Sequence, residues 1–372
     1  MSNTQKKNVP ELRFPEFEGE WEEKQLGNII KVNSGKDYKH LDKGDIPVYG
    51  TGGYMTSVSE PLSEIDAVGI GRKGTINKPY LLEAPFWTVD TLFYCTPKKE
   101  TEILFILSLF RKINWKVYDE STGVPSLSKQ TINKINRFVP TNKEQQKIGK
   151  FFSKLDRQIE LEEQKLELLQ QQKKGYMQKI FSQELRFKDE NGNDYPDWTN
   201  ERLGEVTTVT MGQSPKSVNY TDNSNDTVLI QGNADIENGL INPRIYTREV
   251  TKLIQKDEII LTVRAPVGKL AMAQINACIG RGVCSIKGDK FLYYFLEWFA
   301  TQNKWIRFSQ GSTFESISGN DIRNIHIKIP VEDERTKIIK LLNSLDVLNS
   351  KTDLKIQNLK QRKQSLLQKI FV

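Results

Sequence analysis

Two glycine-rich basic turns are the segments of this sequence best suited to binding a polyanion. The first reads GRKGTI, Gly71–Ile76, and is followed directly by Asn77 and Lys78. The second reads VRAPVGK, Val263–Lys269, and Arg281 follows it in a further glycine-flanked turn. Glycine permits tight turns, and a long cationic side chain on such a turn can reach a phosphate or a base edge. The chemistry indicated is the binding of a charged polymer.

Polar residues on other turns could add hydrogen bonds to base edges. Thr51 and Tyr54 lie on such turns in the first half of the chain, and Gln231 and Asn233 in the second half. Hydroxyl and amide groups can match the donors and acceptors of DNA bases. Taken singly, each of these residues also fits an ordinary solvated loop. The predicted DNA-binding residues are Thr51, Tyr54, Arg72, Lys73, Asn77, Lys78, Gln231, Asn233, Arg264, Lys269 and Arg281.

No familiar catalytic pattern accompanies these turns. GRKGTI lacks the spacing of a phosphate-binding P-loop, and neither a dinucleotide-binding nor a nucleophile-elbow motif is present. The two histidines, His40 and His326, have no cysteine or carboxylate at metal-ligand spacing. The E-x-K triplets Glu22–Lys24 and Glu163–Lys165 are expected to be solvated charges. The motif of amino-methyltransferases is also absent. We therefore predict no catalytic residues, no metal and no cofactor.

The composition is that of a soluble globular protein with a basic balance. The chain has 372 residues, 37% of them hydrophobic and 27% charged, with a net charge of +7. A basic balance favours polyanionic partners. The polar start lacks the apolar core of a signal peptide, no apolar run is long enough to span a membrane, and the three cysteines form no C-x-x-C pair. We expect a cytoplasmic protein without membrane contact.

The elements that must position the turns occur twice. PTNKEQQKIGKFFSKLD at Pro140–Asp156 resembles PVEDERTKIIKLLNSLD at Pro330–Asp346, and the offset is 330 − 140 = 190. Upstream, ELRF at Glu11–Phe14 recurs at Glu184–Phe187, and Trp21 recurs as a tryptophan 177 positions later. Because the offset changes between these points, the intervening residues differ in length and identity. The pattern indicates a tandem repeat with two different globular parts.

Each copy is predicted to end in a long amphipathic helix. Apolar residues recur at the a and d positions of about four heptads in both copies, which is typical of a coiled coil. Thr141 and Glu144 form a capping-box pattern at the first helix start, whereas Val331 replaces the hydroxyl residue in the second. Forty residues at roughly 1.5 Å each would make a rod of about 60 Å. We expect antiparallel pairing; separate packing of each helix on its own domain is the alternative.

Polar residues within the heptad seams suggest a register for this pairing. The expected alignment places Lys363 opposite Glu162 and Lys173 opposite Thr352. A buried polar layer of this kind commonly fixes register and orientation.

The predicted fold class is α+β, with two globular mixed α/β domains joined by two long helices in an antiparallel coiled coil with pseudo-twofold symmetry. Short strand-like runs separated by glycine turns precede a helical stretch in each copy, at residues 103–115 and 291–305. The expected globular domains are 1–140 and 183–329, and the expected helices are 141–182 and 330–372.

Together these features resemble the specificity subunit of type I restriction–modification systems. The resemblance covers nearly the whole chain and rests on the tandem layout, the ELRFPEF opening, the GRKGTI and VRAPVGK turns and the repeated helix starts. It implies that the two globular parts are target-recognition domains, each reading half of a bipartite double-stranded DNA target. The helices would set the spacing and dock two modification subunits, and motor-nuclease subunits would complete the restriction enzyme. Methyl transfer and cleavage would belong to these partners.

Two other functions stay open at this point. The chain could be the recognition part of a fused restriction–methyltransferase enzyme, although it lacks a methyltransferase motif. It could also be a coiled-coil adaptor without a DNA role, although the basic balance and the paired basic turns favour DNA binding.

Overall fold

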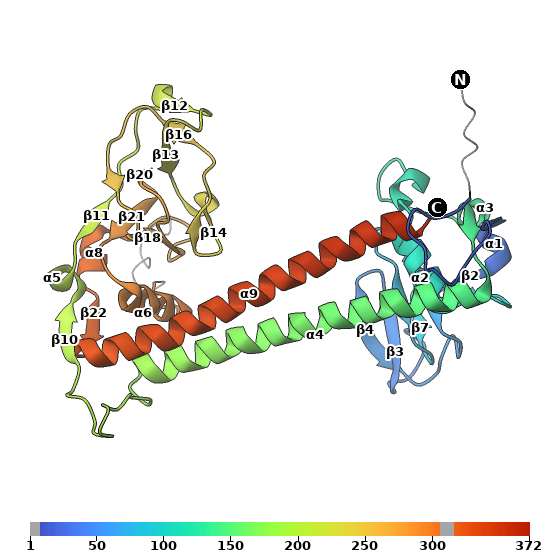
Figure 1. The fold of residues 1–372 in the computed structure, drawn as a ribbon, viewed down its shortest axis with the longest axis horizontal. Coiled ribbons are helices and arrows are strands. Elements are labelled where there is room, and N and C mark those ends of the chain that lie inside the picture. Colours follow the sequence, from blue (N-terminus) through green and yellow to red (C-terminus); the bar gives the residue numbers. More distant parts are fainter. Residues whose placement is uncertain (1–7, 306–315) are drawn as a thin grey trace. The chain divides into compact units, whose positions relative to one another are not determined.

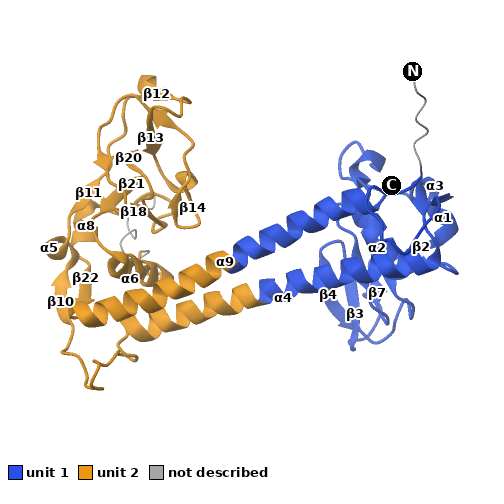
Figure 2. Ribbon diagram, in the orientation of Figure 1, with its two compact units in different colours: residues 1–164, 352–372 blue, residues 165–351 orange. Residues whose placement is uncertain are grey.

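The structure, a computed structural model, describes residues 8–305 and 316–372 (Figure 1). The chain divides into two compact units (Figure 2). Unit 1 comprises residues 1–164 and 352–372, and unit 2 comprises residues 165–351. Unit 1 is therefore built from both ends of the sequence, and each long helix contributes to both units.

Unit 1 combines an antiparallel four-stranded sheet, in the order β2-β8-β5-β6, with a three-stranded sheet, in the order β4-β3-β7. Strand β1 pairs separately with β9. Helix α2 packs its apolar face into the core. The elements are β1 (Glu22–Gln25), α1 (Leu26–Ile29), β2 (Ile30–Ser34), β3 (Ile46–Gly50), β4 (Gly53–Val58), β5 (Ala67–Gly71), β6 (Tyr80–Leu82), β7 (Trp87–Thr88), β8 (Leu92–Pro97), α2 (Ile103–Lys112), η1 (Trp115–Tyr118), α3 (Lys129–Lys134) and β9 (Asn136–Val139).

Unit 2 has a six-stranded sheet, β11-β21-β18-β19-β15-β14, and a five-stranded sheet, β12-β16-β13-β20-β17. Strand β10 pairs separately with β22. The described elements are β10 (Thr199–Arg202), α5 (Leu203–Val206), β11 (Val209–Met211), η2 (Ser217–Asn219), β12 (Tyr220–Thr221), β13 (Thr227–Ile230), η3 (Asn233–Asp235), β14 (Ile236–Glu237), β15 (Leu240–Ile241), β16 (Tyr246–Thr247), β17 (Leu253–Ile254), β18 (Ile259–Thr262), β19 (Leu270–Met272), β20 (Ala277–Ile279), β21 (Val283–Ile286), α6 (Lys290–Thr301), α8 (Gly319–Arg323) and β22 (His326–Ile329).

One interior strand of each main sheet is a nearly continuous apolar run. β5 reads AVGIG and β18 reads IILT, and every residue of both strands is buried. Such runs are expected where a strand is covered on both faces. The mixed α and β composition predicted from the sequence is confirmed, and the predicted helical stretches correspond to α2 and α6.

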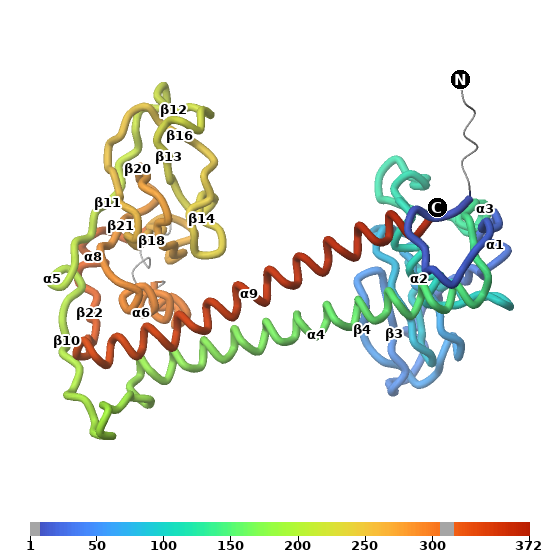
Figure 3. Tube along the Cα trace, in the orientation of Figure 1, coloured from blue at the N-terminus to red at the C-terminus, as the bar shows by residue number. Residues whose placement is uncertain are grey.

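Two long helices follow the globular parts, α4 (Asn142–Phe181) and α9 (Glu332–Ile370). Within each unit they lie side by side and run antiparallel, as the tube in Figure 3 shows. In unit 1, Lys363 of α9 pairs with Asp156 of α4, and Lys355 pairs with Glu162 farther along α4. The predicted antiparallel pairing is confirmed. None of the described helices is long and apolar enough to cross a membrane.

The predicted register of the pair is wrong. Lys363 binds Asp156 rather than Glu162, and in unit 2 Lys173 binds Asp346 at 2.7 Å rather than facing Thr352. The reason is that neighbouring helices take part in these contacts. Asp156 also binds a cation from α2, and Lys173 also binds a carboxylate from α6. Matching the seam residues of the two long helices alone leaves these partners out.

Each globular core is completed by the last turn of a long helix that comes from the other copy of the repeat. In unit 1, Phe371, which directly follows α9, lies against Trp21, with ring centroids 6.2 Å apart, and against Phe105 at 5.6 Å. In unit 2, Phe181 of α4 stacks on Trp298 at 5.5 Å. Leu367 and Ile370 in unit 1, and Met177 and Ile180 in unit 2, join the same cores. Neither copy therefore closes its own core.

A buried carboxylate near the start of each long helix ties that helix to the repeated ELRF segment. Glu144 accepts hydrogen bonds from Arg13 Nε and Nη2, both at 2.8 Å, and from Trp21 Nε1 at 3.3 Å. The Glu144 side chain bonds to these donors and makes no hydrogen bond with Thr141 in the described part of the chain, so the predicted capping box does not form. We call this three-residue arrangement the clamp of unit 1.

Unit 2 has the same clamp. Glu334 accepts bonds from Arg186 Nε at 2.9 Å, from Arg186 Nη2 at 2.8 Å and from Trp198 Nε1 at 2.9 Å. Its side chain is completely buried. The repeated ELRF arginine and the repeated tryptophan therefore have one structural purpose, which is to neutralise and satisfy the carboxylate of the long helix.

Candidate DNA interface

The first basic turn of unit 1 is held by backbone bonds on two sides. β5 ends at Gly71, and the next amide, that of Arg72, donates to the carbonyl of Thr91 at 2.8 Å. On the other side, the amide of Leu127 donates to the carbonyl of Arg72 at 2.9 Å, and that of Gly74 donates to Pro125 at 2.8 Å. The backbone that carries Arg72 and Lys73 is therefore fixed by residues distant in sequence.

The two cations of this turn differ in how they are held. The guanidinium of Arg72 donates to the carbonyl of Asp90 at 3.4 Å and lies 5.9 Å from the ring centre of Phe93, a cation–π distance. The Lys73 side chain is exposed and makes no hydrogen bond or ion pair with any residue that the structure describes. Arg72 is thus oriented by the protein, whereas Lys73 is available to an external partner.

Unit 2 builds a similar turn after β18. The amide of Val263 donates to the carbonyl of Gly282 at 2.9 Å, and the amide of Ile317 donates to the carbonyl of Val263 at 3.0 Å. Arg264 follows and forms an isolated β-bridge with Ser316. Its side chain is exposed.

Arg281 lies on the adjacent turn, between β20 and β21. Its amide donates to Ser214 Oγ at 3.1 Å, and its side chain is exposed. The next residue must be glycine, because a side chain at position 282 would collide with the carbonyl oxygen of Gln231. This close approach brings Gln231 and Arg281 into one local surface.

The loop that carries Gln231 and Asn233 is organised from within the protein. The Asp235 carboxylate accepts from the amides of Gln231, at 2.8 Å, and Gly232, at 3.1 Å. The Lys269 ammonium donates to the carbonyl of Asn233 at 3.2 Å and to that of Ile236 at 2.5 Å. Lys269 is thereby a support for Asn233.

A second set of predicted residues gathers in unit 1 around the β3–β4 hairpin. Thr51 lies in the hairpin turn, and Tyr54, on β4, is 64% exposed. The hydroxyl of Tyr54 bonds to Ser57 Oγ at 3.1 Å, and its ring meets Tyr49 edge-on at 6.4 Å. An exposed, braced aromatic ring of this kind suits contact with a sugar or base.

Asn77 and Lys78 are exposed and lead into β6, where Tyr80 connects them to the same hairpin. The Tyr80 hydroxyl donates to the carbonyl of Gly50 at 2.6 Å. Burial, with a smaller contribution from Tyr49, raises the pKa of Tyr80 well above its usual range, so the hydroxyl stays a donor. Sequence reasoning gave no reason to connect these two segments.

The structure therefore collects the predicted residues into local groups. In unit 1, one group comprises Arg72 and Lys73 and the other comprises the hairpin residues with Asn77 and Lys78. Unit 2 gathers Gln231, Asn233, Lys269 and Arg281 around the β20–β21 turn, with Arg264 on the neighbouring turn. Asp90 and Ser214 belong to these surfaces and were missed, because each is near the basic turns only through strand pairing.

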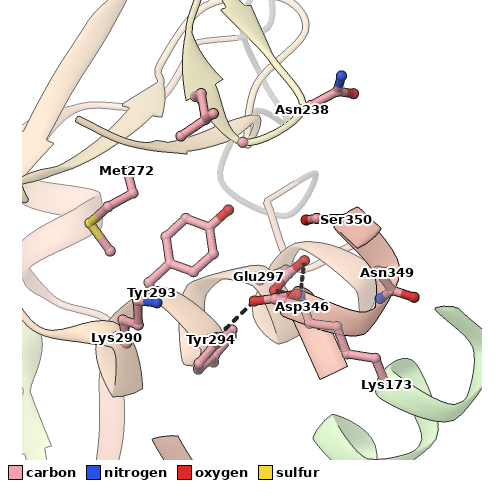
Figure 4. A pocket seen from close by; sticks show the side chains of 12 residues that line it. Lys173, Asn238, Met272, Lys290, Tyr293, Tyr294, Glu297, Asp346, Asn349 and Ser350 are labelled. Atoms are coloured by element: carbon pink, nitrogen blue, oxygen red, sulfur yellow. Dashed lines mark hydrogen bonds and ion pairs between the residues drawn. The ribbon is translucent and has the colours of Figure 1, made fainter. Parts of the chain in front are cut away.

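A pocket in unit 2 contains a cluster of charged side chains (Figure 4). The pocket has a volume of about 340 Å³ and is lined by residues of α4, α6 and α9, by Met272 of β19 and by residues 238–240. Lys173 lies 2.7 Å from both Glu297 and Asp346, and the Tyr294 hydroxyl donates to Asp346 at 2.7 Å. These side chains satisfy one another, so the cluster fastens the two long helices to α6.

The charges of this cluster are mutually dependent. Burial disfavours the ammonium of Lys173, but Glu297 and Asp346 outweigh it and raise the pKa of Lys173. Burial also raises the pKa of Glu297, an effect that Lys173 opposes. Residues 8–305 and 316–372 contain no group of three or more histidine, cysteine, aspartate or glutamate side chains that could hold a metal ion.

Comparison with known families identifies the chain. It matches the family model of the type I restriction modification DNA specificity domain over residues 18–171 and again over residues 195–361. These two matches cover most of the sequence. The protein therefore belongs to this family and contains its domain twice, which agrees with the repeat.

Two curated relatives from Methanocaldococcus jannaschii are specificity subunits by name. The chain is 30% identical over 261 residues to the type I restriction enzyme MjaX specificity subunit, a match covering 66% of this chain and 61% of the relative. It is 25% identical over 312 residues to the MjaVIII specificity subunit, covering 77% of this chain and 71% of that one. The chain thus aligns with less than two thirds of the first relative's length.

Solved structures share the fold at low identity. The S subunit of a type I restriction–modification system from M. genitalium matches 98% of this chain and 99% of its own, with a TM-score of 0.68 and 16% identity. A chain from a structure on the assembly and conformational transition of the type I R-M system matches 94% of this chain and 97% of its own, with a TM-score of 0.59 and 19% identity. The predicted architecture is therefore that of known S subunits.

Proposed function

We propose that this chain is the DNA-specificity subunit of a type I restriction–modification enzyme. The observation that carries the proposal is that a protein with two DNA-specificity domains presents exposed cations on held turns in both units. Each domain would read one half of a bipartite double-stranded DNA target. The subunit would be non-catalytic and would work without a cofactor of its own, in the cytoplasm where its DNA target lies.

The proposed division of labour follows the repeat. Residues 1–140 and 183–329 would form the target-recognition domains, and the helical segments 141–182 and 330–372 would set the spacing between half-sites. The same helices would dock two modification subunits, and motor-nuclease subunits would join them in the restriction enzyme. This assignment is supported by the contribution of each long helix to both units.

Recognition would divide between phosphates and bases. Exposed cationic side chains on the basic turns would bind the DNA backbone and set the position of each domain. Residues with base-edge donors and acceptors, among them Gln231, Asn233 and Arg281, would select the sequence in unit 2. In unit 1, Arg72 and the polar residues around the hairpin, Thr51, Tyr54, Asn77 and Lys78, would have the corresponding role. Lys269 would hold the loop of Asn233 in place.

The direct test is methylome sequencing of cells that carry the modification subunit with and without this chain. We expect a bipartite methylated motif that is present only when the chain is expressed. The absence of any chain-dependent motif, with the assembled complex demonstrated, would contradict the proposal. Salt-dependent binding to duplex DNA, compared between the assembled complex and the modification subunits alone, then separates DNA recognition from the adaptor alternative, since an adaptor would add no salt-dependent binding of its own.

A further inference from the structure

The turns that carry the basic residues are built on one backbone plan in both units. β5 and β18 are each flanked by a later strand in matching register, with Gly71 opposite Leu92 and Thr262 opposite Val283. The offsets are 262 − 71 = 191 and 283 − 92 = 191. The first turn of this arrangement comprises residues 71–74 in unit 1 and 262–265 in unit 2. The second turn comprises residues 89–91 in unit 1 and 280–282 in unit 2. We call the two turns together the paired turns.

The hydrogen bonds that close the paired turns recur at equivalent positions in both units. Arg72 N to Thr91 O, at 2.8 Å, corresponds to Val263 N to Gly282 O, at 2.9 Å. The second turns are closed by equivalent bonds, Leu92 N to Val89 O in unit 1 and Val283 N to Gly280 O in unit 2, at 3.0 and 3.2 Å. A third segment, which contains Ser126 in unit 1 and Ser316 in unit 2, also matches. Lys73 forms an isolated β-bridge with Ser126, and Arg264 forms one with Ser316.

This equivalence pairs residues that the sequence does not align. Arg72 corresponds to Val263, and Asp90 corresponds to Arg281, so these positions differ in charge between the units. Lys73 corresponds to Arg264, and here both units have a cation. Both of these side chains are exposed, and neither forms a hydrogen bond or an ion pair with the described part of the chain.

We propose that Lys73 and Arg264 are equivalent phosphate contacts, one in each recognition domain, and that they position the domain on DNA without reading its sequence. The inference rests on the proposed function. A protein that reads two different half-sites must vary its base-contacting residues, whereas the phosphate backbone is the same at both sites. A position that keeps its charge while its neighbours change fits the phosphate role.

Arg72 and Arg281, the cations near Lys73 and Arg264, make different contacts. Arg72 is directed by Asp90 and Phe93, and Arg281 lies beside Gln231, which suits them to reading bases. The exposed side chains of Lys73 and Arg264 can reach toward the phosphates of bound DNA. Since a phosphate accepts from either cation, Lys73→Arg and Arg264→Lys should each retain the contact.

The test uses the complete complex with its modification subunits and measures DNA affinity against salt concentration. Each phosphate contact adds about 0.9 to the slope of log affinity on log salt. Lys73→Ala and Arg264→Ala should each lower the slope by about 1 and the double variant by about 2. Binding to target and non-target duplexes should weaken by the same factor, so the specificity ratio should not change.

Matched controls lie at the opposite ends of the same strands. Lys99 follows the far end of β8, and Lys287 follows the far end of β21; both are exposed. Lys99→Ala and Lys287→Ala should leave the slope unchanged. The two charge-retaining variants, Lys73→Arg and Arg264→Lys, should do the same.

Three outcomes would overturn the inference. An unchanged slope in both alanine variants would show that these residues do not contact phosphate, and a changed specificity ratio would show that they read bases. Loss of assembly with the modification subunits would show that they bind protein instead. In all three, selective binding by the wild-type complex preserves the proposed function. A wild-type complex without selective binding would refute the proposed function, and the inference with it.

Discussion

In unit 1, Asp156 of α4 lies between two cations, Arg111 of α2 and Lys363 of α9. In unit 2 the equivalent carboxylate is Asp346, since 346 − 156 = 190, and the cation equivalent to Lys363 is Lys173, since 363 − 173 = 190. The third charged residue of the unit 2 cluster is a carboxylate, Glu297 of α6, which binds Lys173, whereas the third residue in unit 1 is an arginine. The same pair of long-helix residues thus sits in a cationic cluster in unit 1 and an anionic cluster in unit 2.

The clamps show the opposite behaviour. Glu144 and Glu334 are held by the same residue types through the same atoms, Nε and Nη2 of an arginine and Nε1 of a tryptophan. The repeat therefore keeps its chemistry where one buried carboxylate ties a long helix to its domain. It changes its chemistry where the helices meet α2 or α6, and again at the paired turns, where the backbone is kept but most charges differ.

Removing a clamp carboxylate is expected to have the largest effect on stability. Glu144→Ala and Glu334→Ala each leave an arginine and an indole N–H without their acceptor, which should cost about 3–5 kcal/mol in the unit concerned. Urea unfolding followed by fluorine-labelled tryptophan, with Trp115 reporting on unit 1 and Trp198 on unit 2, measures each loss separately. Equal losses from the two substitutions would support equivalent clamps.

Glu332→Ala provides the control in the same helix turn as Glu334. Its side chain is exposed, so the free energy of unfolding should change by no more than about 0.5 kcal/mol. A loss from Glu334→Ala as small as that from the control would show that the clamp does not stabilise the unit.

The charge clusters should respond unequally to one and the same substitution. Asp156→Asn leaves Arg111 and Lys363 facing each other without a carboxylate, and we expect a loss of about 1–2 kcal/mol in unit 1. Asp346→Asn leaves Lys173 with Glu297, so unit 2 should lose less than about 1 kcal/mol. The same urea measurement distinguishes them, and a larger loss from Asp346→Asn would reverse the comparison.

The pH dependence should be the smallest effect, with opposite signs in the two units. Burial lowers the pKa of Lys363 below its ordinary 10.5, so its charge costs stability in the folded protein, and unit 1 should gain stability as pH rises through the lowered pKa toward 10.5. The pKa of Lys173 is raised, so its contribution is complete below 10.5 and is lost as pH rises above that value.

Unfolding of the two units between neutral pH and about pH 11 tests these signs, with Lys363→Met and Lys173→Met as references. Each substitution should remove the contribution of its own lysine to the pH dependence of its own unit and leave the other unit unchanged. The assignment would be contradicted if unit 1 lost stability as pH rises toward 10.5 and Lys363→Met removed that loss.

The repeat explains how much of the fold could be predicted. The 190-residue offset located both long helices, and glycine-bounded apolar runs located strands such as β5. The register and the capping box were wrong for one physical reason: their polar groups are satisfied by residues far away in the sequence. Glu144 binds Arg13, which lies 131 positions upstream, and Lys173 binds Glu297, which lies 124 positions downstream.

The sequence predicted the kind of ligand that the candidate interface binds better than it predicted how the interface residues are arranged. Basic residues on glycine turns indicated a polyanion, but the equivalence of Lys73 and Arg264 depends on strand register and third-segment bridges that no short motif encodes. Lys269 was selected for its charge, and only its bonds to two carbonyl oxygens show it as a support for Asn233.

The central claim is that each unit reads its half-site independently on a shared frame. Replacing residues 20–120 by the matching segment of another family member, while keeping Arg13, Trp21, Glu144 and both long helices, tests it most directly. Methylome sequencing of cells carrying the hybrid and its modification subunit should show a motif altered in one half only, with the other half and the spacer unchanged. A motif altered in both halves would contradict independent reading.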